Sequence, residues 1–336
     1  MDQRKINSLD SLRVKLDLML GAAHANETFA IITHNQPDGD GLAACLGLKR
    51  LFASMDITLD IVLQGDSLAK LNFLDVENNT LTLTEEMGYD NLLIIDCHGY
   101  DRIGDAKLLV PKAKRILVID HHILTSVVDN ADYYIATEAA STGVIIYNLL
   151  KDLMQKSDDE TKKYFATAIY TTIINDTNNF LNTNADQEVF RISSELIQYG
   201  ISPAEISLKF LYEKDPLEFK MVGQTLSTIK LYHENKTLLF YTTREFLDSN
   251  KLDDSATSKM TQWVKGVKGI EVVLYYWQKS HNEYKFSIRS EIHNVQQIAK
   301  IFGGGGHDKA SGFTVVGDIK QIIAQVLEEI ESKIYG

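Results

Sequence analysis

Three short apolar runs, each ending on a polar residue, constrain the fold of this chain more than any other feature. They are FAIITH (29–34), NLLIID (91–96) and RILVID (115–120). Each run has the length and composition of a buried β-strand, and a helix-like segment rich in Ala and Leu (41–55) follows the first. Strands that alternate with helices predict a parallel sheet covered on both faces. The fold class is therefore α/β, with a doubly wound, mainly parallel sheet.

The polar residues at the ends of these strands are expected to lie at one edge of the sheet, where such sheets bind ligands. They are His34, Asp96 and Asp120, and neighbouring motifs add Asp38, Asp40, His121, His122 and Asp176. Taken singly, Asp96 and Asp176 are better explained as cap or turn residues, and Asp40 has an alternative explanation as a helix cap. Together, the nitrogen and oxygen ligands suit a pair of divalent ions such as Mn²⁺. Two ions about 3.5–4 Å apart can deliver hydroxide to phosphorus.

The length of 336 residues predicts about two domains. We assign residues 1–200 to a catalytic domain, 201–230 to a helical linker and 231–336 to a smaller α/β domain. The last of these contains FGGGGHDKASGF (302–313). A glycine run lets backbone N–H groups approach an anion closely. Arg289 in SIRS can hold a phosphate with two parallel bonds, although a surface salt bridge explains this arginine almost as well.

The amino-acid composition limits which binding partners and which cell compartment we expect for this protein. The formal net charge of −12 disfavours binding to long duplex nucleic acid. Two cysteines, Cys45 and Cys97, cannot form a disulfide framework and favour a reducing compartment. The longest apolar runs, such as 270–277, are far shorter than the roughly 20 residues that cross a bilayer, and the N-terminus has no signal-peptide core. We therefore expect a cytoplasmic protein with no membrane partner.

Four motifs, HNQPDGD, IIDCHG, IDHH and INDT, resemble in order and spacing those of the DHH phosphoesterases, and GGGGH…ASG resembles the signature of the DHHA1 substrate-binding domain. The resemblance implies two Mn²⁺ ions, with Mg²⁺ or Co²⁺ as candidate substitutes. One ion would be held by His34, Asp38 and Asp96, and the other by Asp40, Asp96, His121 and Asp176, with Asp96 bridging. The expected catalytic residues are His122 and Asp120. The expected substrate-binding residues are Arg289, Ser290, Gly304, Gly305, Gly306, His307 and Ser141.

Within this family the chain resembles the bacterial oligoribonuclease/pAp-phosphatase group and its relatives that cleave cyclic dinucleotides. The expected activity is hydrolysis of oligoribonucleotides of about two to five nucleotides, or of linear dinucleotides such as pApA, to mononucleotides, together with conversion of pAp to AMP. The alternatives are a cyclic-di-AMP phosphodiesterase, an inorganic pyrophosphatase and a nucleotide sensor with weak catalysis. The glycine-rich motif argues against the pyrophosphatase.

Two departures from the family pattern leave questions open. Residues 41–44 lack a serine that is common there, which puts substrate preference in doubt. His98 follows Cys97 where small or hydroxyl residues are more common, and it is either an additional donor at the edge of the site or an ordinary loop histidine. The sequence also leaves open the cleavage polarity and the oligomeric state, for which a homodimer is one candidate.

Overall fold

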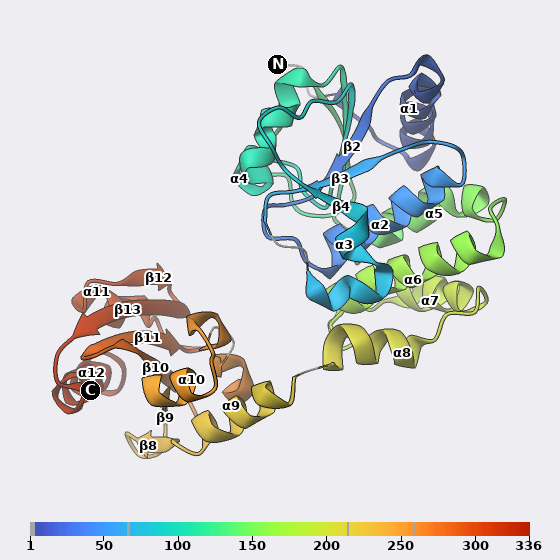
Figure 1. Ribbon diagram of the computed structural model, residues 1–336. Coiled ribbons are helices and arrows are strands. Elements are labelled where there is room, and N and C mark those ends of the chain that lie inside the picture. The colour runs from blue at the N-terminus through green and yellow to red at the C-terminus, as the bar shows by residue number, and fades with distance from the viewer. Residues whose placement is uncertain (1–3, 66–67, 214, 258–259) are drawn as a thin grey trace. The chain divides into compact units, whose positions relative to one another are not determined.

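The computed structural model describes residues 4–65, 68–213, 215–257 and 260–336. It divides the chain into two compact units, Met1–Glu213 and Lys214–Gly336 (Figure 1). The division falls inside the segment 201–230 that the sequence assigned to a linker. This segment contributes α8 (Pro203–Ser207) to the first unit and α9 (Pro216–Leu226) to the second.

The first unit is built on a sheet whose described strands number seven, in the order β1-β7-β6-β5-β2-β3-β4, and every pair that we describe is parallel. The strands are β1 (Arg4–Lys5), β2 (Phe29–Ile32), β3 (Asp60–Leu63), β4 (Thr80–Thr82), β5 (Asn91–Ile95), β6 (Arg115–Asp120) and β7 (Ala131–Ile135). The predicted α/β class with a parallel sheet is confirmed.

Helices lie between the strands of this sheet and follow its last strand, β7. They are α1 (Leu9–Gly21), α2 (Gly39–Ala53), α3 (Val76–Asn79), α4 (Tyr100–Ile103), α5 (Thr142–Met154), α6 (Asp159–Asp176), α7 (Gln187–Ile197) and α8, with the further helical segments η1 (Ala22–Ala25), η2 (Ala69–Leu74), η3 (Gly104–Lys112) and η4 (Leu208–Tyr212). None of the helices in the described part of the chain is both long and apolar enough to cross a membrane.

Alternate residues of the central strands enter two different apolar cores. Leu93 and Ile95 of β5 belong to the core that also contains residues of α1, α2, α5 and α6. Leu92 and Ile94 belong to the opposite core, with Ile103 of α4. A strand that is buried on both faces cannot alternate apolar with polar residues, which is why NLLIID reads as a continuous apolar run.

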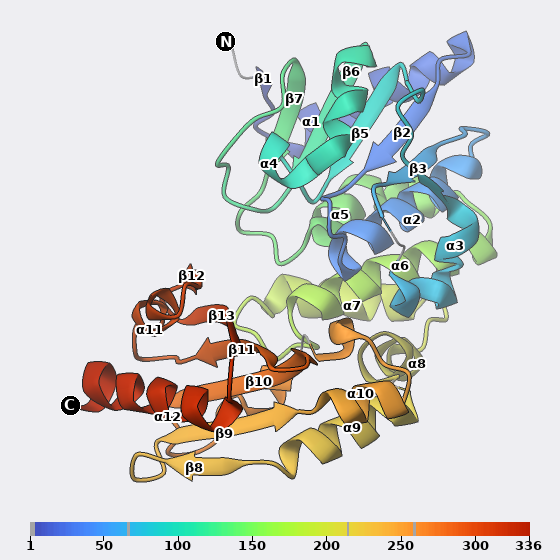
Figure 2. The ribbon, with the colours of Figure 1, turned by 60° about the vertical axis from the view of Figure 1, so that its left-hand side comes forward.

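The second unit contains a mixed sheet in the order β12-β13-β11-β10-β9-β8, in which β9 and β10 are parallel and the other described pairs antiparallel (Figure 2). Its strands are β8 (Lys230–Tyr232), β9 (Thr237–Thr242), β10 (Val272–Ser280), β11 (Glu283–Arg289), β12 (Gly305–His307) and β13 (Ala310–Val316). Its helical segments are α9, α10 (Arg244–Ser249), η5 (Asp254–Thr257), η6 (Met260–Val264), α11 (Gln296–Ile301), α12 (Ile319–Ile330) and η7 (Glu331–Tyr335).

Two apolar cores also flank this second sheet. Phe286 of β11 packs in one core with residues of α11 and α12. Phe240 of β9 and Tyr275 of β10 pack in the other with residues of α9, α10 and η6. The glycine-rich strand β12 lies at the sheet edge, where its residues are exposed.

Candidate active site

The carboxyl ends of three neighbouring strands bring the acidic and histidine side chains of the first unit together. His34 follows β2, Asp96 follows β5 and Asp120 ends β6. Asp96 is almost completely buried, and its backbone adopts a φ of 60°. Its two carboxylate oxygens face different neighbours, because Oδ2 lies 3.6 Å from His34 Nε2 and Oδ1 lies 3.6 Å from His121 Nε2. Asp96 is thus the centre of the cluster.

The first group around Asp96 consists of His34, Asp38 and Asp96, which offer ligand atoms close enough to surround one ion. His34 Nε2 lies 3.7 Å from Asp38 Oδ1 and is buried without a hydrogen-bond partner. Asp38 also caps α2, since its Oδ1 accepts hydrogen bonds from the backbone N–H groups of Asp40 and Gly41 at 3.0 and 3.2 Å. The capping interpretation and the ligand interpretation of Asp38 are therefore compatible.

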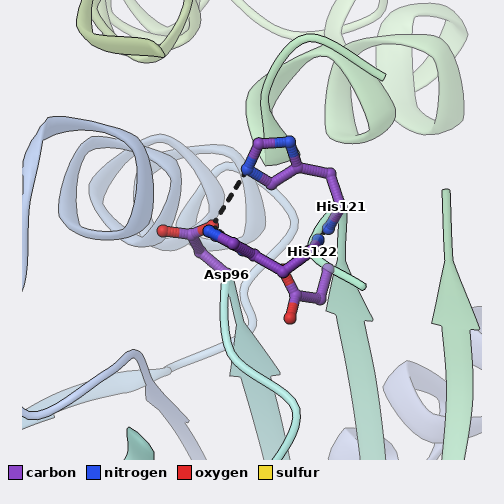
Figure 3. A group of neighbouring side chains, drawn as sticks. Asp96, His121 and His122 are labelled. Carbon is purple, nitrogen blue, oxygen red and sulfur yellow. Dashed lines mark hydrogen bonds and ion pairs between the residues drawn. The ribbon is translucent and has the colours of Figure 1, made fainter. Parts of the chain in front are cut away.

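The second group is formed by Asp40, His121 and Asp176, beside Asp96. His121 Nε2 lies 3.1 Å from Asp176 Oδ2 and 3.7 Å from Asp40 Oδ2. Figure 3 shows the His121 ring directed at the Asp96 carboxylate, with His122 next to it. His121 Nδ1 lies 3.1 Å from the carbonyl oxygen of Ala139, to which it donates, so that Nε2 is the nitrogen directed at the carboxylates.

The electrostatics of the cluster favour a cation. Burial and the nearby charge of Asp176 raise the pKa of Asp40 well above its ordinary value. Burial and the charge of Asp40 do the same to the pKa of Asp96. Burial opposes protonation of His121, but Asp176 and Asp40 outweigh it and raise the pKa of His121 to about 9. Carboxylates that repel one another in a buried site are stabilised by protons or by metal ions.

Two buried ring nitrogens test whether a metal fits. His34 Nε2 and His121 Nε2 both lie among carboxylate oxygens. His34 Nε2 makes no hydrogen bond, and the nearest oxygen to His121 Nε2 in the cluster is Asp176 Oδ2 at 3.1 Å. A buried polar atom without a partner is costly, whereas a lone pair directed at an ion is satisfied. The mixed nitrogen and oxygen donors therefore fit divalent ions.

The N-terminus of α5 holds two of the carboxylates. The backbone N–H groups of Thr142 and Gly143 donate to Asp40 at 2.7 and 3.1 Å, and the Thr142 hydroxyl donates to Asp96 Oδ1 at 3.1 Å. The sequence pointed to both Ser141 and Thr142 at this helix start, and only Ser141 was predicted to bind the substrate. Ser141 is fully buried, and its Oγ accepts the Val144 N–H at 3.3 Å as the cap of α5. The N–H groups that follow a cap lack partners within the helix, and this was the signal for Thr142.

Asp120 and His122 form a second hydrogen-bonded group at the same sheet edge. Asp120 is fully buried, and its Oδ1 accepts the backbone N–H groups of His121 and His122 and lies 2.8 Å from His122 Nδ1. Burial opposes ionisation of Asp120, but the hydrogen bonds from His122 and His98 outweigh it and hold its pKa well below the ordinary value. His122 is the more exposed histidine of the DHH pair, with 39% of its side chain accessible.

The predicted substrate-binding residues of the second unit are more exposed. Arg289 ends β11 on the surface, whereas Ser290 is buried and its Oγ accepts the N–H groups of Ile292 and His293 at 3.3 and 2.9 Å. Arg289 and Ser290 line a pocket of about 330 Å³ together with Lys309. Hence Arg289 presents its guanidinium to solvent, while Ser290 fixes the turn behind it.

The glycines of the second unit allow two strands to approach closely. A Cβ atom at Gly304 would collide with the carbonyl oxygen of Gly312, and one at Gly306 would collide with that of Ala310. Gly306 also has a φ of 136°, which side chains rarely adopt. Gly305 and His307 belong to the same exposed strand, β12. The run is therefore an ordered edge strand paired with β13, not an unpaired loop.

Comparison with known proteins identifies both units. The family described as "DHH family, N-terminal domain" matches residues 28–173, and the DHHA1 domain matches residues 235–335. The chain belongs to the DHH/DHHA1 phosphoesterases. It is accordingly a hydrolase of phosphate esters, with a DHH domain that contains the His–carboxylate cluster and a DHHA1 domain that contains Arg289.

Individual relatives extend over both domains. The chain is 29% identical over 307 residues to the bifunctional oligoribonuclease and PAP phosphatase NrnA of Thermus thermophilus, covering 90% of this chain and 89% of the relative. It is 25% identical over 300 residues to the Bacillus subtilis protein of the same name, covering 86% and 90%. A solved exopolyphosphatase-related protein from Bacteroides fragilis matches with a TM-score of 0.72 at 21% identity, covering 94% of this chain and 97% of the other, and supports the fold.

Proposed function

We propose that this protein is a Mn²⁺-dependent phosphodiesterase that hydrolyses short oligoribonucleotides and linear dinucleotides such as pApA to mononucleotides, and that it converts pAp to AMP. The observation that carries the proposal is the pair of buried ring nitrogens of His34 and His121, which face opposite oxygens of the shared carboxylate of Asp96. The names of the Thermus and Bacillus relatives supply the substrate class.

In this proposal His34, Asp38 and Asp96 hold one ion, while Asp40, Asp96, His121 and Asp176 hold the other. The mixture of imidazole and carboxylate favours Mn²⁺ over Mg²⁺, for which carboxylates alone would suffice. When bound, such a pair of ions lowers the pKa of a shared water and supplies hydroxide for attack on phosphorus.

The residues of the chain itself do the positioning. Thr142, at the N-terminus of α5, donates hydrogen bonds to Asp40 and Asp96. These bonds orient both carboxylates, which are buried away from solvent. Asp120 accepts a hydrogen bond from His122 Nδ1–H, which leaves Nε2 to face the substrate. There Nε2 accepts a proton in the neutral ring, and donates to a phosphoryl or leaving-group oxygen once it carries that proton. Arg289 contributes a planar guanidinium with two parallel donors for a substrate phosphate.

The DHHA1 domain would select for short substrates. We assign a terminal phosphate of the substrate to Arg289. The backbone at Gly304 and at the β12 residues Gly305 and Gly306 would contact the same substrate, with His307 as an additional donor. The net charge of −12 repels long polyanions and fits a substrate with few phosphates. Cys45 and Cys97 are both free and buried, which supports a cytoplasmic location.

A hydrolysis panel tests the proposal. Pyrophosphate, pAp, pApA, cyclic di-AMP and 5′-labelled RNA from dimer to 24-mer are incubated with Mn²⁺ and the wild-type protein, with Asp96→Asn as the inactive control. We expect mononucleotides from pApA and the shortest RNAs, with rates that fall as the RNA lengthens. Activity on pyrophosphate alone or on cyclic di-AMP alone would replace the proposed substrate class, and no activity on the panel would favour a nucleotide sensor.

A further inference from the structure

His98 lies close to the histidines of the DHH motif, His121 and His122, and hydrogen bonds through Asp120 connect it to His122. The residue is 2% exposed and follows β5 in the loop after Asp96. Its Nδ1 lies 2.5 Å from Asp120 Oδ2, the carboxylate oxygen that His122 does not use. The sequence left open whether His98 is an ordinary loop residue or a donor at the edge of the site. Its side chain contacts Asp120, the buried aspartate that also contacts His122.

The contacts of His98 fix which of its nitrogens carries the proton. The backbone N–H of Thr125 is directed at His98 Nε2 at 3.1 Å, and a backbone N–H can only donate. Nε2 must therefore accept, and the proton of the neutral ring is on Nδ1. The Nδ1–H group then donates to Asp120 Oδ2, while Asp120 Oδ1 accepts the Nδ1 proton of His122.

The surroundings hold this arrangement in place. The Tyr133 hydroxyl lies 3.3 Å from the His98 carbonyl oxygen, to which it can donate. The Ser126 hydroxyl donates to Asp101 at 2.5 Å, which connects α4 to the loop after His122. A Cβ atom at Gly99 would collide with Ser126, so the two loops are packed as closely as glycine allows. His98 is therefore held at a fixed distance from Asp120.

We propose that His98 is a positioning residue: by donating to Asp120 Oδ2 it fixes that carboxylate, which in turn holds His122 with its proton on Nδ1 and with Nε2 directed toward the substrate. The proposal rests on the proposed function for the role of His122 in turnover. Without His98, Asp120 Oδ2 loses its only side-chain donor among the described contacts, and this fully buried carboxylate is held through Oδ1 alone, which fixes its orientation toward His122 less firmly.

A matched pair of amide variants tests the proposal by kinetics. His98→Asn places an amide N–H near the position of Nδ1, whereas His98→Gln extends its amide toward Thr125 and away from Asp120. With pApA and Mn²⁺ we expect His98→Asn to retain most of the wild-type kcat and His98→Gln to lose about 10-fold or more, with KM and bound metal unchanged in both. Thr125→Ala removes the hydroxyl that lies 3.2 Å from His98 Nε2 but keeps the backbone N–H that donates to this nitrogen, and it should behave as wild type. Equal kcat values for the Asn and Gln variants would overturn the proposal.

A second measurement does not depend on turnover. Ring-¹⁵N histidine spectra of the Mg²⁺-loaded protein, with the His122 signals assigned from a His122→Asn variant, report which nitrogen of His122 is protonated. We expect an Nδ1–H ring in the wild type and in His98→Asn, and a mixture of tautomers in His98→Gln. An unchanged His122 signal in His98→Gln would refute the role of His98. If the wild type cleaves no substrate of the panel, the proposed function fails while this spectrum still decides the role of His98.

Discussion

The two domains present their functional residues in opposite ways. In the DHH domain, Asp40, Asp96 and Asp120 are each 1% exposed or less, and backbone or side-chain donors hold all three. In the DHHA1 domain, Arg289 and His307 are exposed at strand ends. Buried, hydrogen-bonded groups are costly to disturb but fixed in geometry, whereas exposed groups depend on the ligand to order them. Substitutions in the DHH cluster should therefore affect kcat and metal content, and those in the DHHA1 domain should affect KM.

The largest effect is expected from Asp96→Asn, because Asp96 is the carboxylate that both candidate ion sites share. The variant should lose bound Mn²⁺, and kcat should fall by about 10³-fold or more, since a metal ion contributes several kcal/mol of transition-state stabilisation. Its Tm without metal should match or exceed that of the wild type, because a repelling charge has been removed. Metal analysis, kinetics and thermal unfolding measure these three quantities.

Asp60→Asn is the matched control for this variant. Asp60 begins β3 of the same sheet, so it lies at the amino end of the strand, whereas the cluster lies at the carboxyl ends. Its carboxylate accepts a hydrogen bond from the Tyr89 hydroxyl at 3.0 Å. It should keep both metal and turnover. An Asp96→Asn variant that retains two Mn²⁺ per chain would contradict the shared role of Asp96.

In the DHHA1 domain, Arg289→Ala should raise KM for pApA about tenfold or more with kcat and bound Mn²⁺ unchanged. A hydrogen bond to a charged group contributes about 1.5–3 kcal/mol, which corresponds to this change in affinity. Arg289→Lys should give an intermediate KM, because lysine keeps the charge and loses the paired donors. Steady-state kinetics measure both, with Lys279→Ala, an exposed cation at the far end of β10, as the control. If KM stays at the wild-type value, Arg289 does not contact the substrate.

The features of the fold and of the site that depend on local sequence pattern could be predicted from the sequence. Continuous apolar runs such as NLLIID follow from burial on both faces, and the carboxyl ends of parallel strands meet whatever the details of the loops. The contact between His98 and Asp120 joins residues 22 positions apart and depends on the packing of Gly99 against Ser126, which no spacing rule describes. Likewise, the choice between Ser141 and Thr142 depends on the rotation of α5 about its axis.

The charged residues clustered in the DHH domain should also make the stability of the metal-free protein depend on pH. The pKa of His121 is raised to about 9 in the folded protein by Asp176 and Asp40 against the effect of burial. A raised pKa adds stability that is fully present below the unfolded value of about 6.5 and is lost as the pH rises through 9. The raised pKa values of Asp40 and Asp96 act in the same direction.

We therefore expect the Tm of the EDTA-treated protein to fall by several degrees between about pH 6.5 and 9. Asp120, whose pKa is lowered, loses its contribution only under acidic conditions and does not oppose this trend. Thermal unfolding across this range measures the effect, and His121→Gln should flatten it. A metal-free wild type whose Tm rises over the same range would show that the carboxylates around His121 are not close enough to hold its proton.

The smallest effect is expected from Ser141→Ala, which separates a structural role from substrate binding. Ser141 Oγ accepts the Val144 N–H at the buried start of α5 and lies 3.2 Å from Thr172 Oγ1. Loss of a helix cap typically lowers the free energy of unfolding by about 1 kcal/mol. Urea unfolding should show this loss, while KM for pApA stays unchanged. Ser8→Ala removes the exposed cap of α1 and should cost no more. If Ser141→Ala instead raises KM at unchanged stability, the hydroxyl binds the substrate. Substrate recognition would then involve α5 of the DHH domain as well as the DHHA1 domain.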